Sequence, residues 1–169
     1  MQIHSGRFKG QRIKTVKNFP YRPTQSIVRK SLFDIIEPLN CKNFLDLFSG
    51  TGIIGFEAAS RGVDNIFFVD KSIRVYSLLK INSSNFPGVK FRFSRSDGLK
   101  FVNYDKKYDI IFADPPYDYP HTDALIKLSC QALEKKGKLI LESSKNEFII
   151  IPNRQRKIGD SYVSFWNNE

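Results

Sequence analysis

The sequence predicts an α/β fold with a mainly parallel sheet of seven strands, helices on both faces and an antiparallel hairpin at its C-terminal end. Three observations lead to this prediction. Strand-like apolar runs alternate with helical segments from residue 43 to residue 142, a glycine-rich loop follows the first of these runs, and the last two strands have no helix between them. A small basic β-hairpin is expected to precede this domain, which divides the chain into residues 1–22 and residues 23–169.

Length and composition suit one domain of this kind. The chain has 169 residues, of which 41% are hydrophobic, so it can bury a core and is not a disordered basic tail. Two cysteines and two histidines, at no ligand-like spacing, predict neither a disulfide framework nor a metal site. The first residues lack an apolar signal-peptide core, and no eighteen apolar residues run together, so we expect a cytoplasmic protein without a membrane span.

The charge is concentrated at the N-terminus. The formal net charge is +10, and the first 33 residues contain eight basic residues and no acidic one. Such a concentration of positive charge attracts a polyanion, most commonly a nucleic acid. The alternative is a basic face that is merely solvated. The residues expected to contact nucleic acid are Arg7, Lys9, Arg12, Lys14, Arg22 and Arg29.

The N-terminal elements are predicted from local patterns. Residues 2–16 alternate loosely around a glycine-containing turn, which indicates a β-hairpin. A helix is expected from an N-cap at Thr24 to about Glu37, where Pro38 stops it. Because Arg29 lies off the apolar stripe of this helix, we expect its side chain on the exposed face.

The remainder of the chain alternates strands and helices. The expected strands are 43–48, 65–70, 89–94, 108–113 and 138–142, with helices at 53–61, 72–83, 97–101 and 122–136. Glycines follow the first and the last of these helices, as is typical of helix ends. Residues 147–151 and 161–166 are expected to pair as the terminal antiparallel hairpin.

The glycine-rich loop is the first motif that indicates chemistry. The first strand continues into Asp46-Leu47-Phe48-Ser49-Gly50-Thr51-Gly52, and the pattern G-x-G-x-x-G ends at Gly55. In a dinucleotide site Gly50 would make the tight turn and Gly52 would let the backbone approach the ligand, while Asp70, twenty residues on, would accept the ribose hydroxyls.

S-adenosylmethionine is the competing ligand for this loop. Its binding also requires backbone without side chains, and it favours an acidic residue before the glycines, the place that Asp46 occupies. A carboxylate there can accept a hydrogen bond from the methionine ammonium, while Asp70 again binds the ribose. Asp97 would accept a hydrogen bond from the exocyclic amine of adenine.

The second motif is an Asp-Pro-Pro-Tyr tetrapeptide directly after the strand at 108–113. Ligands bind at the carboxyl ends of strands in such a sheet, and prolines present carbonyl acceptors without N–H donors. This array suits an aromatic amine, with Asp114 and the Pro115 carbonyl each taking one N–H and Tyr117 stacking on the base. A rigid turn is the structural alternative. The expected catalytic residues are Asp114, Pro115, Pro116 and Tyr117.

Three functional classes are compatible with these motifs: an RNA amino-methyltransferase, a nicotinamide oxidoreductase and a noncatalytic RNA-binding module. An oxidoreductase would need a substrate domain, and too little chain follows the sheet to form one. A noncatalytic module would leave the Asp-Pro-Pro-Tyr motif unexplained. The methyltransferase interpretation accounts for both motifs.

Together the motifs resemble the RsmD family of bacterial small-subunit rRNA guanine-N2 methyltransferases, which are class I enzymes dependent on S-adenosylmethionine. The resemblance covers nearly the whole chain. The matching segments are Ser5-Gly6-Arg7-Phe8-Lys9-Gly10, Arg22-Pro23-Thr24, the loop from Leu45 to Gly52, Asp114-Pro115-Pro116-Tyr117 and Gly159-Asp160. Lys30, where the family commonly has an acidic or amide residue, and a short tail depart from the pattern.

The resemblance implies a Rossmann-like methyltransferase fold, S-adenosylmethionine as cofactor, and an N-terminal hairpin that holds 16S rRNA, either naked or in an assembling 30S subunit. We also expect a monomer without a metal. N6-adenine methylation of DNA or RNA stays an alternative, because the same acceptors serve either amine. The expected cofactor-binding residues are Asp46, Phe48, Ser49, Gly50, Thr51, Gly52, Asp70, Lys71, Asp97 and Gly98.

Overall fold

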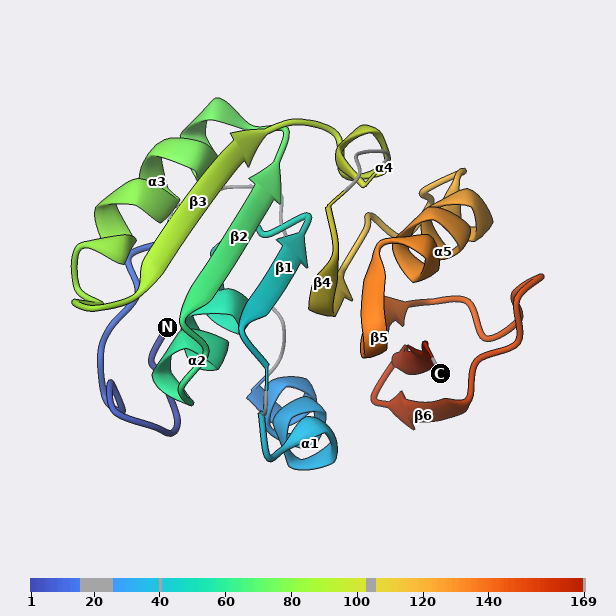
Figure 1. Ribbon diagram of the computed structural model, residues 1–169, viewed down its shortest axis with the longest axis horizontal. Helices are drawn as coiled ribbons and strands as arrows, with labels where there is room; N and C mark the ends of the chain where they lie inside the picture. The colour runs from blue at the N-terminus through green and yellow to red at the C-terminus, as the bar shows by residue number, and fades with distance from the viewer. Residues whose placement is uncertain (16–25, 40, 103–105, 169) are drawn as a thin grey trace.

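The computed structural model describes residues 1–15, 26–39, 41–102 and 106–168 (Figure 1). Its strands are β1 (Asn43–Leu47), β2 (Asn65–Asp70), β3 (Lys90–Arg95), β4 (Tyr108–Ala113), β5 (Leu133–Ser143), β6 (Arg154–Ile158) and β7 (Ser161–Asn167). Its helices are α1 (Ser26–Ile36), α2 (Ile53–Ser60), α3 (Ile73–Ser83), α4 (Gly98–Phe101) and α5 (Thr122–Gln131).

In the described residues, all seven strands form one sheet, in the order β3-β2-β1-β4-β5-β7-β6. The first five strands of this order are parallel, β7 runs antiparallel to β5, and β6 runs antiparallel to β7. The predicted fold class, with its terminal antiparallel hairpin, is confirmed. From β1 the strands are added towards β3 on one side and from β4 towards β5 on the other, so the fold has a switch point between β1 and β4, where ligands of open α/β sheets bind.

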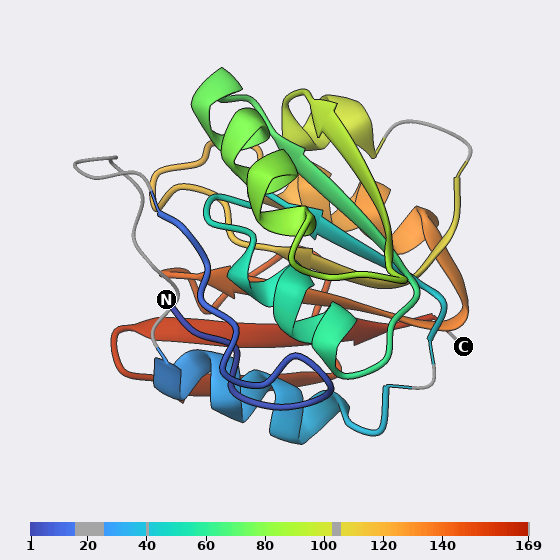
Figure 2. The ribbon, with the colours of Figure 1, turned by 90° about the vertical axis from the view of Figure 1, so that its left-hand side faces the viewer.

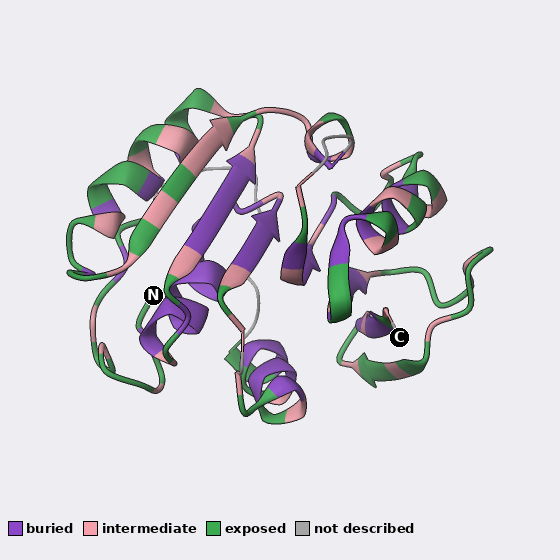
Figure 3. Ribbon diagram, in the orientation of Figure 1, coloured by how far each residue is buried: buried purple, intermediate pink, exposed green. Residues whose placement is uncertain are grey.

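Each face of the sheet carries its own layer of helices. Successive residues of a strand point to opposite faces, so Phe44 packs with α1, α2 and α3, whereas Leu45 packs with α5. The central strands β1 and β2 are almost wholly buried, and the edge strands β3 and β6 are largely exposed (Figure 3). None of the helices described is long and apolar enough to cross a bilayer.

The basic N-terminal segment is less regular than the predicted hairpin. Residues 1–15 double back on themselves, but a single antiparallel bridge, between Gln2 and Arg12, takes the place of two continuous strands. Ile3 and Ile13 are 1% and 3% exposed and belong to the same core cluster as α1, α2 and α3. The segment therefore runs alongside α1 and α2 (Figure 2) as an integral layer of the domain.

A buried charge fastens this segment to α2. Glu57, with no exposed surface, accepts hydrogen bonds from the backbone N–H groups of His4 (2.9 Å) and Ser5 (3.0 Å). Its carboxylate also pairs with Arg61 at 2.9 Å and lies 3.9 Å from the guanidinium of Arg29. These partners compensate the desolvation of the carboxylate.

The side chain of Arg29 is buried, contrary to the expectation that it lies on the exposed face of its helix. It is 4% exposed, its guanidinium donates a 3.1 Å hydrogen bond to the carbonyl of Gln2, and it contacts the ring of His4. The prediction that Arg29 lies on the outer face of its helix and contacts RNA is wrong, because a long side chain off the apolar stripe can still be covered by another segment. Thr24 and Arg22, the other predicted residues here, lie outside the described residues.

The terminal hairpin uses a different strand from the one predicted. Residues 147–151 lie outside the sheet, and β6 is the polar segment Arg154–Ile158. The reason is the tight turn at Gly159-Asp160, where Gly159 has φ +61° and Ile158 pairs with Ser161. This turn places the residues directly before it, rather than the more apolar segment upstream, beside β7.

The last helix is shorter than predicted. It ends at Gln131, and β5 begins at Leu133, so Gly137 does not close the helix. The C-terminal tail holds the first residues of β5 in place. Asn168 donates from its side chain to the carbonyl of Leu133 (3.2 Å), and its own carbonyl accepts from the N–H of Lys136 (2.7 Å). Such long-range contacts are invisible in the local pattern.

Candidate active site

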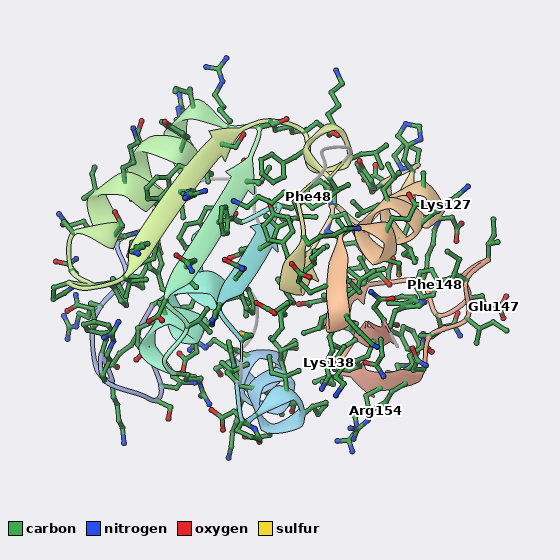
Figure 4. All side chains as sticks on the ribbon, viewed as in Figure 1. Phe48, Lys127, Lys138, Glu147, Phe148 and Arg154 are labelled. Atoms are coloured by element: carbon green, nitrogen blue, oxygen red, sulfur yellow. The ribbon has the colours of Figure 1, made fainter. Side chains whose placement is uncertain are left out.

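A cleft of about 550 Å³ lies over the carboxyl ends of the strands, where Phe48 is labelled in Figure 4. Nearly all the predicted cofactor and catalytic residues line it, although they come from four separate stretches of sequence. They are Asp46, Phe48, Ser49, Gly50, Thr51, Asp70, Lys71, Asp97, Gly98, Asp114, Pro115, Pro116 and Tyr117. Gly52 is the predicted residue outside this lining.

Ser49 joins the glycine-rich loop to the neighbouring strand. Its hydroxyl donates to the carbonyl of Asp46 (2.6 Å) and accepts from the backbone N–H of Val69 (2.9 Å). Because Ser49 is buried, these bonds are shielded from water and hold the turn after β1 against β2.

Asp70 organises the same loop from the end of β2. One carboxylate oxygen accepts from the N–H of Gly50 (3.0 Å), and the other accepts from the N–H of Ser72 (2.9 Å). Each oxygen has a second lone pair, so the carboxylate can still accept a hydroxyl from a ligand. Asp70 therefore both shapes the loop and presents an acceptor to the cleft.

Asp46 is the most deeply buried carboxyl of the cleft, with 2% of its surface exposed. It accepts a hydrogen bond from the N–H of Gly55. Burial raises its pKa well above the usual range, and the nearby Asp114 and Asp70 raise it further. A site with this electrostatic character favours a positively charged ligand group beside Asp46.

The two glycines of the loop have different roles. A Cβ on Gly50 (φ +51°) would meet no protein atom closer than 3.9 Å, so its backbone is open to the cleft. A Cβ on Gly52 (φ +74°) would lie 2.4 Å from Leu79 and 2.8 Å from Phe56. Gly52 is therefore required for packing α2 on α3, and the expectation that its bare backbone approaches the ligand is not what the geometry supports.

An aromatic wall closes another side of the cleft. Phe48 has φ +58°, and its ring meets that of Tyr119 edge to face at 5.2 Å. A Cβ on Gly98 would come within 2.7 Å of the Phe48 ring, so only glycine lets the ring lie there. Asp97 caps α4 by accepting from the N–H of Leu99 (3.0 Å). Asp97 and Gly98 thus line the cleft together.

Tyr119 is a cleft residue that the sequence analysis missed. Its hydroxyl is buried and has no hydrogen-bond partner among the residues described. Burial raises its pKa, and Asp97 raises it further, so the phenol stays protonated and can donate a hydrogen bond. No local pattern predicts this role, because Tyr119 follows a turn and belongs to no motif.

The Asp-Pro-Pro-Tyr motif is held at the end of β4. The N–H of Asp114 lies 3.5 Å from the carbonyl of Leu47 in β1, which keeps the motif beside the glycine-rich loop. The carbonyl of Pro116 accepts from the backbone N–H three residues further on (2.9 Å), whereas Pro115 is buried at the cleft. Tyr117 is 49% exposed and lines the mouth of the cleft.

The end of β5 supplies a further wall that was not predicted. Glu142 is 6% exposed and lines the cleft together with Ser143, Ser144 and Lys145. The rule that identified Asp114 applies equally here, since Glu142 stands at the carboxyl end of a parallel strand. Its position follows an unremarkable apolar run, so no motif drew attention to it.

The predicted RNA-binding side chains of the N-terminal segment are exposed. The backbone N–H of Arg7 donates to the carbonyl of Ser60 (2.8 Å), the last residue of α2. The cleft lies at the opposite end of this helix, so Arg7 is remote from it. The exposed residues are Arg7, Lys9, Arg12 and Lys14.

Comparisons with known proteins agree with this geometry. A family model described as "Conserved hypothetical protein 95" matches residues 1–167. "Ribosomal RNA small subunit methyltransferase D" of Buchnera aphidicola is 32% identical over 160 residues, covering 89% of this chain and 81% of the relative.

Two solved structures show the same fold. "Putative methyltransferase yhhF from Escherichia coli" superposes with a TM-score of 0.88 over 100% of this chain and 98% of that one, at 23% identity. The crystal structure of "SMU.776, a putative methyltransferase complexed with SAH" has a TM-score of 0.67 over 83% of this chain and 48% of that one, at 18% identity.

The sheet order and the cleft define a class I methyltransferase, an enzyme class that uses S-adenosylmethionine as cofactor. Within this class, the chain belongs to the family described as Conserved hypothetical protein 95, which is the RsmD family that its motifs resemble.

Proposed function

We propose that this protein transfers a methyl group from S-adenosylmethionine to the exocyclic N2 amine of a guanine in small-subunit ribosomal RNA. The observation that carries the proposal is the position of Asp114 and Pro115 on the cleft that also contains Asp46 and Asp70. The relatives named ribosomal RNA small subunit methyltransferase D support the choice of RNA.

The residues of the cleft fit S-adenosylmethionine. Three carboxylates from the ends of three strands match its three kinds of donor: Asp46 the ammonium, Asp70 the ribose hydroxyls and Asp97 the adenine amine. The open backbone at Gly50 accommodates a ligand, and Phe48 offers an aromatic surface. When bound, S-adenosylmethionine supplies an electrophilic methyl group on a sulfonium.

The tetrapeptide acts on the amine that receives this methyl group. Asp114 and the carbonyl of Pro115 each accept one N–H, which orients the nitrogen lone pair toward the methyl carbon, and Tyr117 stacks on the base. The nitrogen would become cationic and acidic as its bond to the methyl carbon forms and the bond from that carbon to sulfur breaks, the electron pair staying on sulfur. Asp114 then takes the proton and passes it to water, so positioning and electrostatics provide most of the catalysis.

The exposed basic residues of the N-terminal segment are the proposed RNA anchor. Arg7 lies a helix length from the cleft, so a structured RNA would bind both regions at once. N6-adenine methylation is the second candidate function, because Asp114 and Pro115 could hold that amine equally well.

The test is methylation of naked 16S rRNA and of 30S particles, both from cells that lack the protein, followed by mass mapping of the nucleosides. We expect N2-methylguanosine at one position, in one or both substrates. N6-methyladenosine instead would overturn the proposal in favour of the second candidate. A matched reaction with the Asp114→Ala variant should yield no methylated nucleoside.

A further inference from the structure

Two carboxylates line the cleft at the ends of adjacent strands: Asp114 directly follows β4, and Glu142 is the last residue but one of β5. Phe112 of β4 pairs with Ile140 of β5, and both face the same core cluster. Side chains alternate along a strand, so Asp114 and Glu142, each two residues further on, lie on that same face. Neighbouring strands are about 5 Å apart. Both residues line the cleft, and Glu142 is 6% exposed.

The carboxylate of Glu142 is not required to hold an amine. Asp114 and the Pro115 carbonyl already provide an acceptor for each N–H of an exocyclic NH₂ group. Two like charges on neighbouring strands also disfavour one another. A ligand edge with a third N–H beside the amine would suit both carboxylates, because Glu142 presents a further acceptor on the wall of the cleft.

Among the nucleobase amines, one has such a neighbour. The N2 amine of guanine is flanked by the N1–H donor, whereas the N6 amine of adenine and the N4 amine of cytosine are flanked on their pairing edges by ring nitrogens that only accept. A carboxylate beside the target amine therefore attracts guanine and repels the lone pair of adenine or cytosine.

We propose that Glu142 is a specificity-determining residue that accepts the N1–H of the target guanine while Asp114 and Pro115 hold its N2 amine. This inference rests on the proposed function and explains how the same Asp-Pro-Pro-Tyr array is restricted to guanine. Glu142 selects the base, and Asp114 orients the amine.

The experiment measures kcat/KM with two RNAs, one carrying the target guanine and one carrying 2-aminopurine at that position. 2-Aminopurine keeps the N2 amine but has a bare acceptor at N1. The Glu142→Gln variant can donate to that acceptor, so its guanine-to-2-aminopurine ratio should fall at least about 10-fold below that of the wild type. The missing O6 affects both enzymes and cancels in this comparison.

Glu147→Gln is the matched control. Glu147 is exposed on the loop after β5, is not part of the cleft lining and lies at the outer edge of the molecule in Figure 4, so this variant should keep the wild-type ratio. Calorimetric S-adenosylmethionine binding by Glu142→Gln checks its fold. If that variant is unstable, Glu142→Ala should likewise lose activity on guanine and keep its activity on 2-aminopurine.

An unchanged ratio in a folded Glu142 variant, with the wild type active on guanine, would overturn the role of Glu142 and leave the proposed function intact. Wild-type activity on adenine but not on guanine would overturn both.

Discussion

The carboxylate of Asp46 accepts a 3.0 Å hydrogen bond from the backbone N–H of Gly55, which lies nine residues later in α2. This bond connects the end of β1 to the first turn of the helix and fixes the course of the glycine-rich loop between them. It does not compensate fully for burial, because the pKa of Asp46 is still raised well above the usual range. The apoprotein therefore carries an electrostatic cost that a cationic ligand would relieve.

Asp46→Asn should stabilise the apoprotein and weaken its affinity for S-adenosylmethionine. The amide oxygen can still accept from Gly55, and the buried charge is gone. When the folded-state pKa of a carboxyl is raised, the folded protein becomes less stable as the pH rises through that pKa. The stability that Asp46→Asn gains over the wild type should therefore appear at neutral pH and vanish in acid. We expect Tm to rise by about 2–4 °C and affinity to fall about 10- to 100-fold. Thermal unfolding at several pH values and calorimetry measure both, and a variant no more stable than the wild type would contradict this account.

Substitutions of the two loop glycines should separate ligand binding from packing. Gly50→Ala places a methyl group in open space at the cleft, so apart from the strain of its positive φ, which Gly52→Ala shares, its main effect should be weaker cofactor binding. Gly52→Ala forces a methyl group against Leu79 and Phe56, so it should destabilise the fold by about 1–3 kcal/mol. Denaturant unfolding and cofactor titration of both variants check this contrast, and equal losses of stability would refute it.

Asp114→Ala should reduce the single-turnover rate of methyl transfer at least about 100-fold while cofactor affinity stays within about tenfold of the wild type. The carboxylate orients the amine and is not needed to hold the cofactor. Asp118→Ala is the control, because Asp118 is exposed four residues away and is not part of the cleft lining. A chemical step of normal speed in Asp114→Ala would remove Asp114 from the mechanism.

Neutralising the exposed basic residues of the N-terminal segment should weaken RNA binding and its salt dependence. Deleting the segment would expose the core at Ile3 and Ile13, so glutamine substitutions are the sharper experiment. Four lost phosphate contacts should lower the slope of log K against log salt by about 3. The substituted residues are Arg7, Lys9, Arg12 and Lys14.

The control for that experiment neutralises Arg154, Arg156 and Lys157, which are exposed in and near the edge strand β6. We expect this variant to keep the wild-type slope. The reverse result, with a change of slope only in the β6 variant, would move the proposed RNA surface to the β6 edge of the sheet.

Arg29→Ala should destabilise the protein by about 3 kcal/mol without changing the salt dependence of RNA binding. The substitution removes a buried partner of Glu57 and the hydrogen bond to Gln2. Lys30→Ala, at the exposed neighbouring position, should change stability by less than about 0.5 kcal/mol. Chemical denaturation measures both, and equal stabilities would contradict the structural role of Arg29.

The sequence by itself determined the α/β class and most of the cleft residues. Alternating strands and helices are visible because apolar periodicity is local, and the carboxyl ends of parallel strands must meet at one edge of the sheet. The sequence alone therefore places Asp46, Asp70 and Asp114 together, although the first and the last are 68 positions apart.

Only the tertiary structure decided the roles that depend on contacts between distant segments. Arg29 is buried because residues 1–15 cover it, Gly52 is required because α3 packs against it, and Glu142 lines the same cleft as Asp114 because β5 pairs with β4. The turn at Gly159-Asp160 likewise selected a polar edge strand over a more apolar segment. Burial and pairing across the sheet are properties of the assembled chain, so no window of sequence contains them.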